Sequence, residues 1–553
     1  MAQTRDSRAR IFCWLLAGSL FVGCTAAQRG EAPDDAPPRL LERLGSHELR
    51  VTTSSEVAQR YFNQGLALTY GFNHAAAIAA FEEAAERDPS CAMCFWGKAL
   101  ALGPNINAPM GPDAGRAAHA AAQKAYALRE SGTAKERALI EALTTRYVAD
   151  PPEDRAELDL AYANAMRAVQ TAHPEDTDVA TLTAEALMDL YPWNYWTANG
   201  EPREHTDELI ALIEGVLEVE PYHLGANHYY IHAVEEYHPA KAESAADRLA
   251  GAAPDAGHLV HMPSHIYWRV GRYHDAAEIN QEAASADEQY FAWCRPGGFY
   301  RALYYPHNIH FLWAAASAQG RSELAMTAAR KLAQQVEPLH AEFPLVEEFL
   351  TVPQLTLVRF GRFDAVLGEP KPPEGRVFQT GLWHYARGVA LAKLGRVDEA
   401  EAELDAVEAL ATTDEAAEMF VSGGVATAAG LMELGVEHLA GEIASASGDA
   451  DSAIAALESA VARQDELAYM EPPPWYFPVR QSLGAELLAN ERAVEAEAVY
   501  RTDLEQYPEN GWSFFGLAQA LEAQGRTAEA NMAQAYHQKA FEEADVQLEA
   551  SVF

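Results

Sequence analysis

The stretch FNQGLALTYGFNHAAAIAAFEEAAERDP, residues 62–89, decides the fold. Its apolar residues recur at the spacing of amphipathic helices rather than the alternation of strands. Small residues stand at Gly65 and Ala77, an aromatic residue at Phe81 and a proline at Pro89. Small residues allow two helices to pack closely, and proline cannot continue a helix. The stretch therefore predicts one helix–turn–helix hairpin.

The turn between two helices recurs along the chain as a glycine with a small residue five positions later. Glycine provides the left-handed residue that ends the first helix, and alanine lets the second helix approach the first. The copies are Gly271/Ala276, Gly320/Ala325, Gly395/Ala400, Gly448/Ala453 and Gly525/Ala530, with degenerate copies at Gly361/Val366 and Glu491/Ala496. The spacing resembles the 34-residue tetratricopeptide repeat, TPR. We therefore expect an all-α, TPR-type superhelix of helical hairpins, an α-solenoid with irregular inserted loops.

The N-terminal residues predict export rather than repeat structure. Residues 1–24 have a basic start, a short apolar run and the ending FVGC, which resembles a bacterial lipobox with Cys24 as the lipid-modified residue. Ordinary cleavage after Ala26 or Ala27 is the alternative. Residues 25–50 are polar and Pro-rich at their start and predict a disordered tether. The expected location is the bacterial cell envelope, as an outer-membrane lipoprotein that faces the periplasm.

Two repeat blocks are expected beyond the tether. They are residues 51–366, with a His-rich groove, and residues 379–553, divided at the Pro-rich stretch GEPKPPEG. Four other interruptions are candidate lids or hinges, because repeat loops often lie at a binding edge. They are residues 103–115, 151–154, 293–298 and 471–478.

The charge of the chain excludes some partners. Its 553 residues include 81 acidic and 41 basic side chains, a formal net charge of −40. Nucleic-acid binding depends on Lys and Arg neutralising phosphates, so no nucleic-acid partner is expected. An anionic lipid surface is disfavoured for the same reason, which leaves membrane contact only through the N-terminal lipid anchor.

Histidines concentrate in one part of the chain. Ten of the 19 lie between His223 and His310, and seven of these ten lie on three successive helices that we expect to line the groove. The candidate metal ligands are His228, His232 and Glu235 on the first helix, His261 and His265 on the second, and His307 and His310 on the third; His258 shares the face of the second helix.

This pattern predicts one or two transition-metal ions, with zinc, copper or iron as the candidates. Histidine pairs three or four residues apart can hold one ion from a single helix. Pro263 and Pro306 suit the first turn of a helix, where the helix dipole keeps a nearby imidazole neutral and able to bind metal. The alternatives are a His-lined groove for a peptide or small molecule, and histidines that only pack.

Other residues are candidates to support this site. Glu185 and Asp189 could supply oxygen ligands or a general base, although a solvated acidic face is the favoured interpretation. The aromatic stretch YPWNYW, residues 191–196, could wall a pocket, although core packing is the default interpretation. Cys91 and Cys94 in CAMC predict a local disulfide or buried thiols rather than a catalytic pair. The hydrogen-bonding candidates beside the histidines are Tyr229, Tyr267 and Tyr305.

Several longer strings resemble a group of bacterial exported proteins that contain TPRs. They are CAMCFWGKALALGPNINAPM, NHYYIHAVE, HMPSHIYWRVGRYHDA, YPHNIHF and PPPWYFPVRQSLGAELL. The resemblance implies the same repeat fold over most of the chain after about residue 50. It implies no particular reaction, so the metal hypothesis depends on spacing alone.

Two functions from different classes remain open from the sequence. In the first, the metal site is catalytic, and an open position on the metal activates water or dioxygen with help from Glu235 or a tyrosine, as in a metal-dependent hydrolase or oxidase. In the second, the groove binds a peptide or protein partner without chemistry. Metal analysis and the convergence of the imidazole nitrogens distinguish the two.

Overall fold

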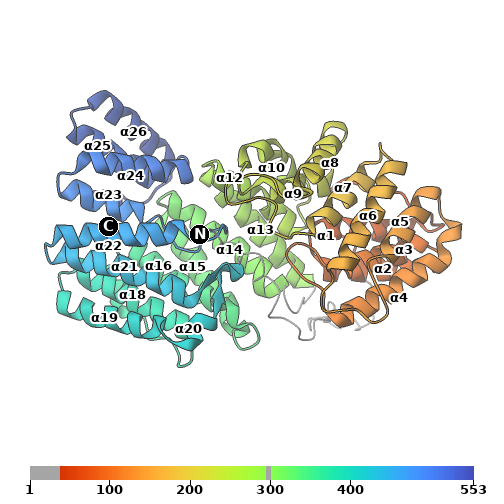
Figure 1. The fold of residues 1–553 in the computed structure, drawn as a ribbon, viewed down its shortest axis with the longest axis horizontal. Helices are drawn as coiled ribbons and strands as arrows, with labels where there is room; N and C mark the ends of the chain where they lie inside the picture. The colour runs from red at the N-terminus through yellow and green to blue at the C-terminus, as the bar shows by residue number, and fades with distance from the viewer. Residues whose placement is uncertain (1–37, 294–299) are drawn as a thin grey trace, which may run out of the picture. The chain divides into compact units, whose positions relative to one another are not determined.

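The computed structural model describes residues 38–293 and 300–553, which are helical almost throughout (Figure 1). The described residues form two compact units. The first unit contains the residues up to Ile266 together with Glu282–Tyr305, and the second contains Tyr267–Gln281 and Pro306–Phe553.

In the first unit, helices follow one another with short connections. They are α1 (Glu56–Tyr70), α2 (His74–Arg87), α3 (Ala92–Ala101), α4 (Pro112–Leu128), α5 (Ala134–Thr144), α6 (Ala156–Ala172), α7 (Thr177–Met188), α8 (Thr206–Val219), α9 (Leu224–Val234), α10 (Glu243–Leu249) and α11 (Gly257–His261). Short turns of 3-10 helix lie at Arg129–Ser131 and Pro239–Ala242, and a π-helical turn lies at Tyr300–Tyr304. The chain passes between the units three times, within α12 (Pro263–Arg269), within α13 (Tyr273–Trp293) and after the first residue of α14 (Tyr305–Ala318).

The second unit has the same build. Its helices are α14 (Tyr305–Ala318), α15 (Ser322–Val336), α16 (Glu347–Arg359), α17 (Phe363–Gly368), α18 (Val377–Lys393), α19 (Val397–Ala411), α20 (Asp414–Glu418), α21 (Ala428–Ala446), α22 (Ala450–Asp465), α23 (Arg480–Ala489), α24 (Ala493–Gln506), α25 (Gly511–Ala523) and α26 (Thr527–Ala540). Short 3-10 turns lie at Glu337–Leu339, Pro344–Val346 and Ser422–Gly424, and an antiparallel pair, β1 (Phe420–Val421) and β2 (Ala426–Thr427), precedes α21.

The first hairpin, α1 and α2, confirms the interpretation of residues 62–89. Helix α1 begins after Ser55, whose side chain caps the Ala58 N–H, and α2 ends before Pro89. Phe81 of α2 is fully buried and lies so close to Gly65 of α1 that a β-carbon on Gly65 would approach the Phe81 ring to 2.7 Å. The glycine is thus needed for the close approach of the two helices.

The turns between later helices also have the predicted form. At all seven predicted turn positions φ is positive, and the residues are Gly271, Gly320, Gly361, Gly395, Gly448, Glu491 and Gly525. The small residue five positions later is buried in each case. The described residues thus form an all-helical, TPR-like array of stacked helix pairs, as predicted. The predicted division near 366–378 lies inside the second unit, at the connection between α17 and α18, and remains a prediction about repeat blocks.

The N-terminal segment that the structure describes makes specific contacts, although the sequence predicts a disordered tether to residue 50. Arg43 forms an ion pair with Asp255 at 2.7 Å. His47 lies 2.9 Å from an oxygen of Asp178 on α7. Residues 38–50 are therefore held against the first unit by charge. The predicted lipid site, Cys24, and also Cys294 lie outside the described residues.

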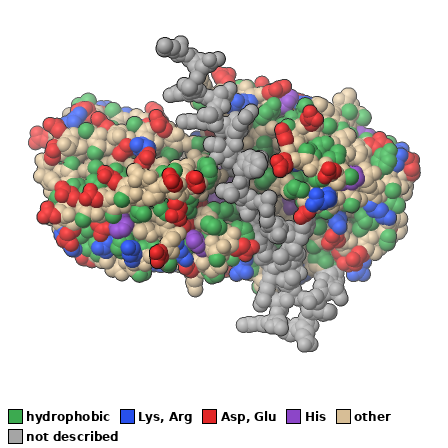
Figure 2. Space-filling model, turned by 60° about the horizontal axis from the view of Figure 1, so that its bottom comes forward, with side chains coloured by type: hydrophobic (Ala, Val, Ile, Leu, Met, Phe, Trp, Pro, Cys, Tyr) green, Lys and Arg blue, Asp and Glu red, His purple; other side chains and the backbone are tan. Residues whose placement is uncertain are grey.

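No helix in the described ranges combines the length and the apolar character that crossing a membrane requires. On the face of the molecule in Figure 2, acidic side chains are scattered among neutral ones. On this face the negative charge is distributed rather than gathered in one patch, as expected for solvated helix faces.

Candidate metal centre

Helix α9 is buried on all sides and supplies two of the candidate ligands. Every residue from Leu224 to Val234 is buried. The helix begins after His223, whose Nδ1 accepts a hydrogen bond from the Ala226 N–H at 3.2 Å. His228 and His232 are four residues apart, so their rings share one face of α9. The ring centroids are 4.8 Å apart.

His258, His261 and His265 lie on two short helices. The sequence predicts one continuous helix through them, but α11 ends at His261 and α12 begins at Pro263. The break arises because proline lacks the N–H of a helical hydrogen bond and its ring clashes with the preceding turn. The prediction that Pro263 occupies the first turn of a helix is confirmed.

His228, His232 and His258 form a buried group of three. Each offers one ring nitrogen, and the three nitrogens lie within 4.8 Å of one another. Ligands at about 2.1 Å from one tetrahedral ion stand about 3.4 Å apart, so a shift on the order of 1 Å per ring closes the group around an ion. His258 is an addition to the predicted ligands, since the sequence places it on the correct face but does not count it among them.

The hydrogen bonds of this group leave bare nitrogens. His228 Nδ1 donates to the carbonyl oxygen of Tyr70 at 2.5 Å, and His232 Nδ1 lies 3.4 Å from Oε1 of Glu235. Among the described residues, the Nε2 atoms of His228 and His232 and both ring nitrogens of His258 have no hydrogen-bond partner. A ring that donates from one nitrogen to a carbonyl or carboxylate and presents the other nitrogen is the arrangement of metal-binding histidines.

Burial sets the charge of these rings. It lowers the pKa of His228, His232 and His258 well below the usual value, and the neighbouring histidines lower each pKa further, because two adjacent rings cannot both be charged. The three imidazoles are therefore neutral at pH 7, which is the form that binds a transition metal. Buried polar atoms normally have partners, so unpartnered nitrogens in one place indicate a ligand.

Glu235 connects this group to a second pair of histidines. Its Oε1 lies 3.4 Å from His232 Nδ1, and its Oε2 lies 3.4 Å from His265 Nδ1. The Nε2 atoms of His265 and His261 are 3.0 Å apart, and His261 Nδ1 is 3.3 Å from Ser264 Oγ. The carboxylate of Glu235 is 1% exposed and orients both rings. The predicted cluster of α9, α11 and α12 is therefore assembled within the first unit.

Aromatic side chains enclose the group of three. The Phe72 ring centroid lies 4.6 Å from that of His228, and Phe72 stacks on the other two rings. Trp193 meets His232 edge-on at 5.0 Å, and Tyr304 meets His258 in the same way at 4.8 Å. Trp193 belongs to the predicted aromatic wall at 191–196. Phe72 could not be recognised from the sequence, because its pattern is that of an ordinary core residue beside a turn.

Phe72 and Trp193 also have unusual backbones. Their φ angles are +54° and +58°, a left-handed conformation that bulky residues rarely adopt. Backbone strain of this kind persists where surrounding contacts hold it, and it concentrates at functional sites. The Trp193 indole N–H donates to Asn107 Oδ1 at 3.1 Å, which connects the wall to the predicted lid at 103–115.

His307 and His310 lie on α14 in the second unit. The His310 ring stacks on Trp313 at 5.1 Å, and burial lowers the pKa of His310 to about 3. The His307 ring packs edge-on against Phe311. Pro306 is the second residue of α14, as predicted. The participation of these two histidines in the cluster remains a prediction.

The three candidate tyrosines are dispersed. Tyr229 lies beside the group, with its ring 5.4 Å from that of His228. The Tyr305 hydroxyl donates to Glu288 Oε1 at 2.9 Å, and the Tyr267 ring of the second unit lies under the Arg272 guanidinium at 4.1 Å. Tyr229 is therefore the candidate tyrosine whose contact with the group of three is established.

Glu185 and Asp189 are buried, so the interpretation as a solvated acidic face is wrong. Both lie around Arg146, which is fully buried and forms an ion pair with Asp189; Arg146 Nη1 lies 4.0 Å from Glu185. Arg146 Nε also lies 3.8 Å from Asp159. The sequence cannot reveal this, because the arginine lies about 40 residues away on the chain.

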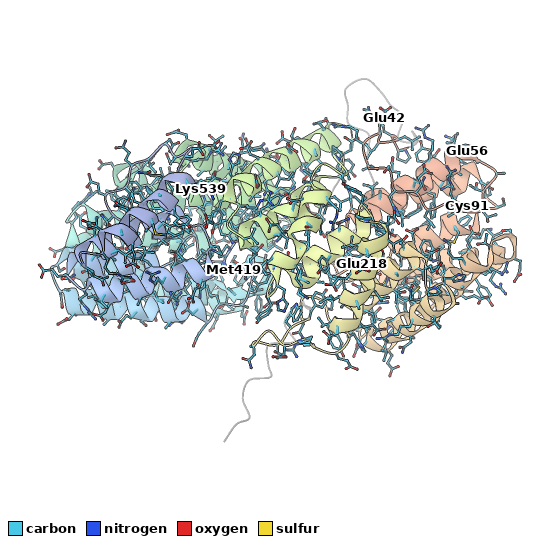
Figure 3. All side chains as sticks on the ribbon, turned by 90° about the horizontal axis from the view of Figure 1, so that it is seen from above. Glu42, Glu56, Cys91, Glu218, Met419 and Lys539 are labelled. Atoms are coloured by element: carbon cyan, nitrogen blue, oxygen red, sulfur yellow. A yellow bond between two sulfur atoms is a disulfide. The ribbon has the colours of Figure 1, made fainter. Side chains whose placement is uncertain are left out.

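Cys91 and Cys94 form a disulfide at the start of α3, where Figure 3 labels Cys91. Both residues are fully buried, and Cys91 Sγ caps the Cys94 N–H. The disulfide that the CAMC sequence predicts as one of two possibilities is therefore present. Its position favours a structural role at the beginning of the helix.

A separate ionic cluster holds the N-terminal segment. His47 lies between Asp178, at 2.9 Å, and Glu220, at 3.3 Å, and His223 Nε2 lies 3.5 Å from Asp178. The Tyr70 hydroxyl donates to the same Asp178 oxygen at 3.1 Å. Both nitrogens of His47 face carboxylates, which favours a charged ring rather than a metal ligand.

Comparisons with known proteins agree with the fold. Residues 58–91 match the family described as tetratricopeptide repeat. No curated protein is significantly similar in sequence. Similar solved structures include yeast Tom70 (12% identity, 87% of this chain and 90% of that one, TM-score 0.29) and a human IFIT1 dimer with PPP-AAAA (12%, 89% and 92%, 0.31). At TM-scores this low they carry no information about function. The chain thus carries a tetratricopeptide repeat at residues 58–91, within an array of helix pairs of the same kind.

Proposed function

We propose that this protein binds one or two transition-metal ions, the first at His228, His232 and His258. The observation that carries the proposal is the set of unpartnered ring nitrogens that converge in one buried place. Zinc, copper and iron all accept imidazole ligands, and the residues present do not select among them. Histidines used only for packing would place their nitrogens against hydrogen-bond partners.

A second ion is proposed at His261 and His265. Their Nε2 atoms are 3.0 Å apart, and Glu235 lies between His265 and His232. A carboxylate that contacts one histidine of each group supports a pair of neighbouring ions, because its charge offsets part of theirs. The extension of this site to His307 and His310 remains a proposal from the spacing of the histidines.

The finer proposal is a metal-dependent hydrolase or oxidase. Three histidine ligands leave one position of a tetrahedral ion open, and a bound metal there lowers the pKa of water or polarises a substrate. Phe72, Trp193 and Tyr304 would present aromatic surfaces to that substrate. The Glu235 carboxylate contacts Nδ1 of the His232 ring. We therefore expect Glu235 to affect the reaction by positioning His232 as a ligand.

Metal analysis of the purified protein tests the proposal. After treatment with EDTA and dialysis against zinc sulfate, we expect one to two zinc ions per chain by mass spectrometry of the metal. His232→Ala and His258→Ala should each weaken binding of the first ion by about 10–100-fold or more, because each removes a ligand of the ion itself. His261→Ala should remove only the second ion.

His438→Gln provides the matched control. His438 is equally buried in the second unit, but both of its nitrogens have partners, Tyr385 and Ser482. Its substitution should leave the zinc content unchanged. The proposal is wrong if the parent chain binds no zinc, copper or iron. It is also wrong if the His232→Ala and His258→Ala variants keep the helical content of the parent and bind as much metal as the parent does.

A second candidate is a scaffold that binds a peptide or protein partner. The match of residues 58–91 to the tetratricopeptide repeat supports it, since helix pairs of this kind form extended binding surfaces. A pull-down in which the partner is retained after EDTA treatment and by the His258→Ala variant would favour this function over the metal-dependent one.

We also propose the cell-envelope location that the N-terminal sequence predicts. The disulfide at Cys91 and Cys94 supports it, because disulfides persist mainly in exported proteins. Incorporation of labelled palmitate that Cys24→Ala abolishes would support the lipid anchor, and incorporation that is unchanged in this variant would contradict it.

A further inference from the structure

The second unit contains a small pocket that is separate from the histidine cluster. It is lined by parts of α12, α14, α16 and the loop at 471–478 that the sequence marks as a candidate lid. Its apolar walls include Trp268, Trp313 and Phe477. The cavity measures about 30 Å³, which is room for about two water molecules or for the two oxygens of a carboxylate.

Arg359 is the charged group of this pocket. It is 6% exposed, and among the described residues that line the pocket it alone carries a charge. One Nη donates to Gln481 Oε1 at 2.7 Å, and the guanidinium carbon lies over the Trp512 ring, 3.6 Å from its centroid. No carboxylate oxygen of a described residue lies within ion-pair distance of it. Burial lowers the pKa of Arg359 to about 9, against the smaller opposite effects of Tyr476 and of the buried Asp503, which acts on it from beyond ion-pair distance. A buried arginine without an acid partner is costly and indicates an anion that is supplied from outside.

Two more buried donors face the same pocket without partners. They are the Trp475 indole N–H and the Ser317 hydroxyl, whose residues are 2% and 5% exposed. Indole can only donate a hydrogen bond. Together with Arg359, the pocket therefore presents three donors and a positive charge within apolar walls.

We propose that this pocket binds a carboxylate that is attached to an apolar or aromatic body. The two carboxylate oxygens of the ligand accept hydrogen bonds from the Arg359 guanidinium, the Trp475 indole N–H and the Ser317 hydroxyl. The bonds to the carboxylate are charge-assisted and therefore strong. The cavity has room for the carboxylate alone, so the apolar body lies at its mouth, against the prolines at 472 and 473. A free aromatic acid and the C-terminus of a peptide that ends in an aromatic residue share this chemistry.

Calorimetric titration with sodium phenylacetate tests the proposal on metal-free full-length protein. We expect saturable binding, and about tenfold weaker binding of the neutral analogue phenylacetamide, because it lacks the charge that pairs with Arg359. A tripeptide that ends in phenylalanine, with a free or an amidated terminus, distinguishes the sources. Tighter binding of the free peptide identifies a peptide terminus, and binding of phenylacetate alone identifies a small acid; both support the pocket.

Variants assign the binding to these residues. Arg359→Gln should weaken phenylacetate binding at least about tenfold, and Ser317→Ala and Trp475→Phe by about threefold to tenfold each. Arg330→Gln, at a half-exposed arginine that pairs with Glu369, is the matched control and should not change the affinity. If Arg359→Gln fails to fold, Ser317→Ala still tests the proposal, because it removes only one hydroxyl group. Absence of saturable binding, equal binding of phenylacetamide, or unchanged affinity in folded Arg359→Gln or Ser317→Ala would overturn the proposal.

Discussion

At the residue scale, the candidate metal centre depends on which nitrogen of each imidazole carries a proton. The Tyr70 carbonyl oxygen accepts from His228 Nδ1, so the lone pair of His228 is on Nε2 and faces the group. Glu235 acts in the same way on His232. Two acceptors outside the group therefore orient the rings before any ion arrives, and this reduces the cost of binding.

The same tyrosine joins the centre to the N-terminal segment. Its carbonyl contacts His228, while its hydroxyl donates to Asp178, which pairs with His47. The His47 side chain is 6% exposed and the Asp178 side chain 10%. Because the pair is buried, its hydrogen bonds are expected to contribute more to stability than a surface ion pair does.

The contribution of His47 to stability should depend on pH. Burial by itself lowers the pKa of His47, but the hydrogen bond and charge of Asp178, with the charge of Glu220, outweigh it, so the pKa is raised above 6.5. The stabilisation is therefore fully present below about pH 6.5 and is lost as pH rises through the raised pKa. We expect His47→Gln to lower the free energy of unfolding by about 1.5–3 kcal/mol at pH 5.5 and by less at pH 9.

Urea unfolding of metal-free protein across this pH range measures the effect. His119→Gln, on α4 and away from this ionic cluster, is the control and should show no such pH dependence. A His47→Gln effect that is constant with pH, or that grows toward pH 9, would contradict a charged His47 in the folded protein.

At the element scale, the hairpins share one turn geometry. The second residue after the first helix adopts a positive φ, and glycine fills this position in six of the seven predicted turns. Glu491 is the exception, with φ at +58° on the exposed turn between α23 and α24. A side chain at such a position costs about 1 kcal/mol or more relative to glycine.

We expect Glu491→Gly to raise the free energy of unfolding by up to about 1 kcal/mol, since relief of the left-handed strain exceeds the entropy that glycine loses on folding. Gly525→Ala makes the opposite change. A β-carbon on Gly525 meets no atom within 4 Å, so only the backbone conformation, with φ at +73°, opposes it. It should lower stability by about 1 kcal/mol.

Thermal unfolding of both variants checks this pair of predictions. Because the two substitutions share a turn geometry and differ in direction, their effects should have opposite signs. If Glu491→Gly destabilises the protein as Gly525→Ala does, the strain at Glu491 is compensated by its own interactions and the argument fails.

At the scale of the whole molecule, the chain consists of two units built from neighbouring helix pairs. In such arrays, stability is a sum of local terms and interfaces between neighbours. A ligand that binds one part stabilises that part first. The candidate metal centre is assembled from α9, α11 and α12 in the first unit, and the Arg359 pocket belongs to the second.

Addition of zinc should therefore slow amide hydrogen exchange locally. We expect increased protection in residues 224–266 and no change in residues 428–540, because zinc adds binding energy only to the segments that hold it. Exchange measured by mass spectrometry with and without zinc tests this. Equal protection of both ranges would show that the chain opens as one cooperative unit, and protection of neither would contradict the metal site.

The hairpins could be predicted from the sequence because their causes are local. Helix period, turn glycines and the small residues between helices act within about 34 residues. The face shared by His228 and His232 follows from their spacing on one helix. The break at Pro263 was foreseeable from proline chemistry, although the sequence analysis treats α11 and α12 as one helix.

The remaining features depend on residues far apart in the chain. The acceptor for His228 is Tyr70, 158 residues away, and Phe72 and Trp193 come from two other parts of the first unit. The expectation that Glu185 and Asp189 form a solvated face is wrong for the same reason, since charged residues in a helix period do not reveal whether a partner such as Arg146 is buried with them.

The sequence by itself determined that this protein is an array of helix pairs with histidines on neighbouring helices, because short-range periodicity encodes both. Only the tertiary structure decided that His258 joins His228 and His232, that their bare nitrogens converge, and that Arg359 lies in an aromatic pocket with no ion-pair partner among the described residues. These properties arise from packing between distant segments, and packing sets the burial and the hydrogen-bond partners on which chemistry depends.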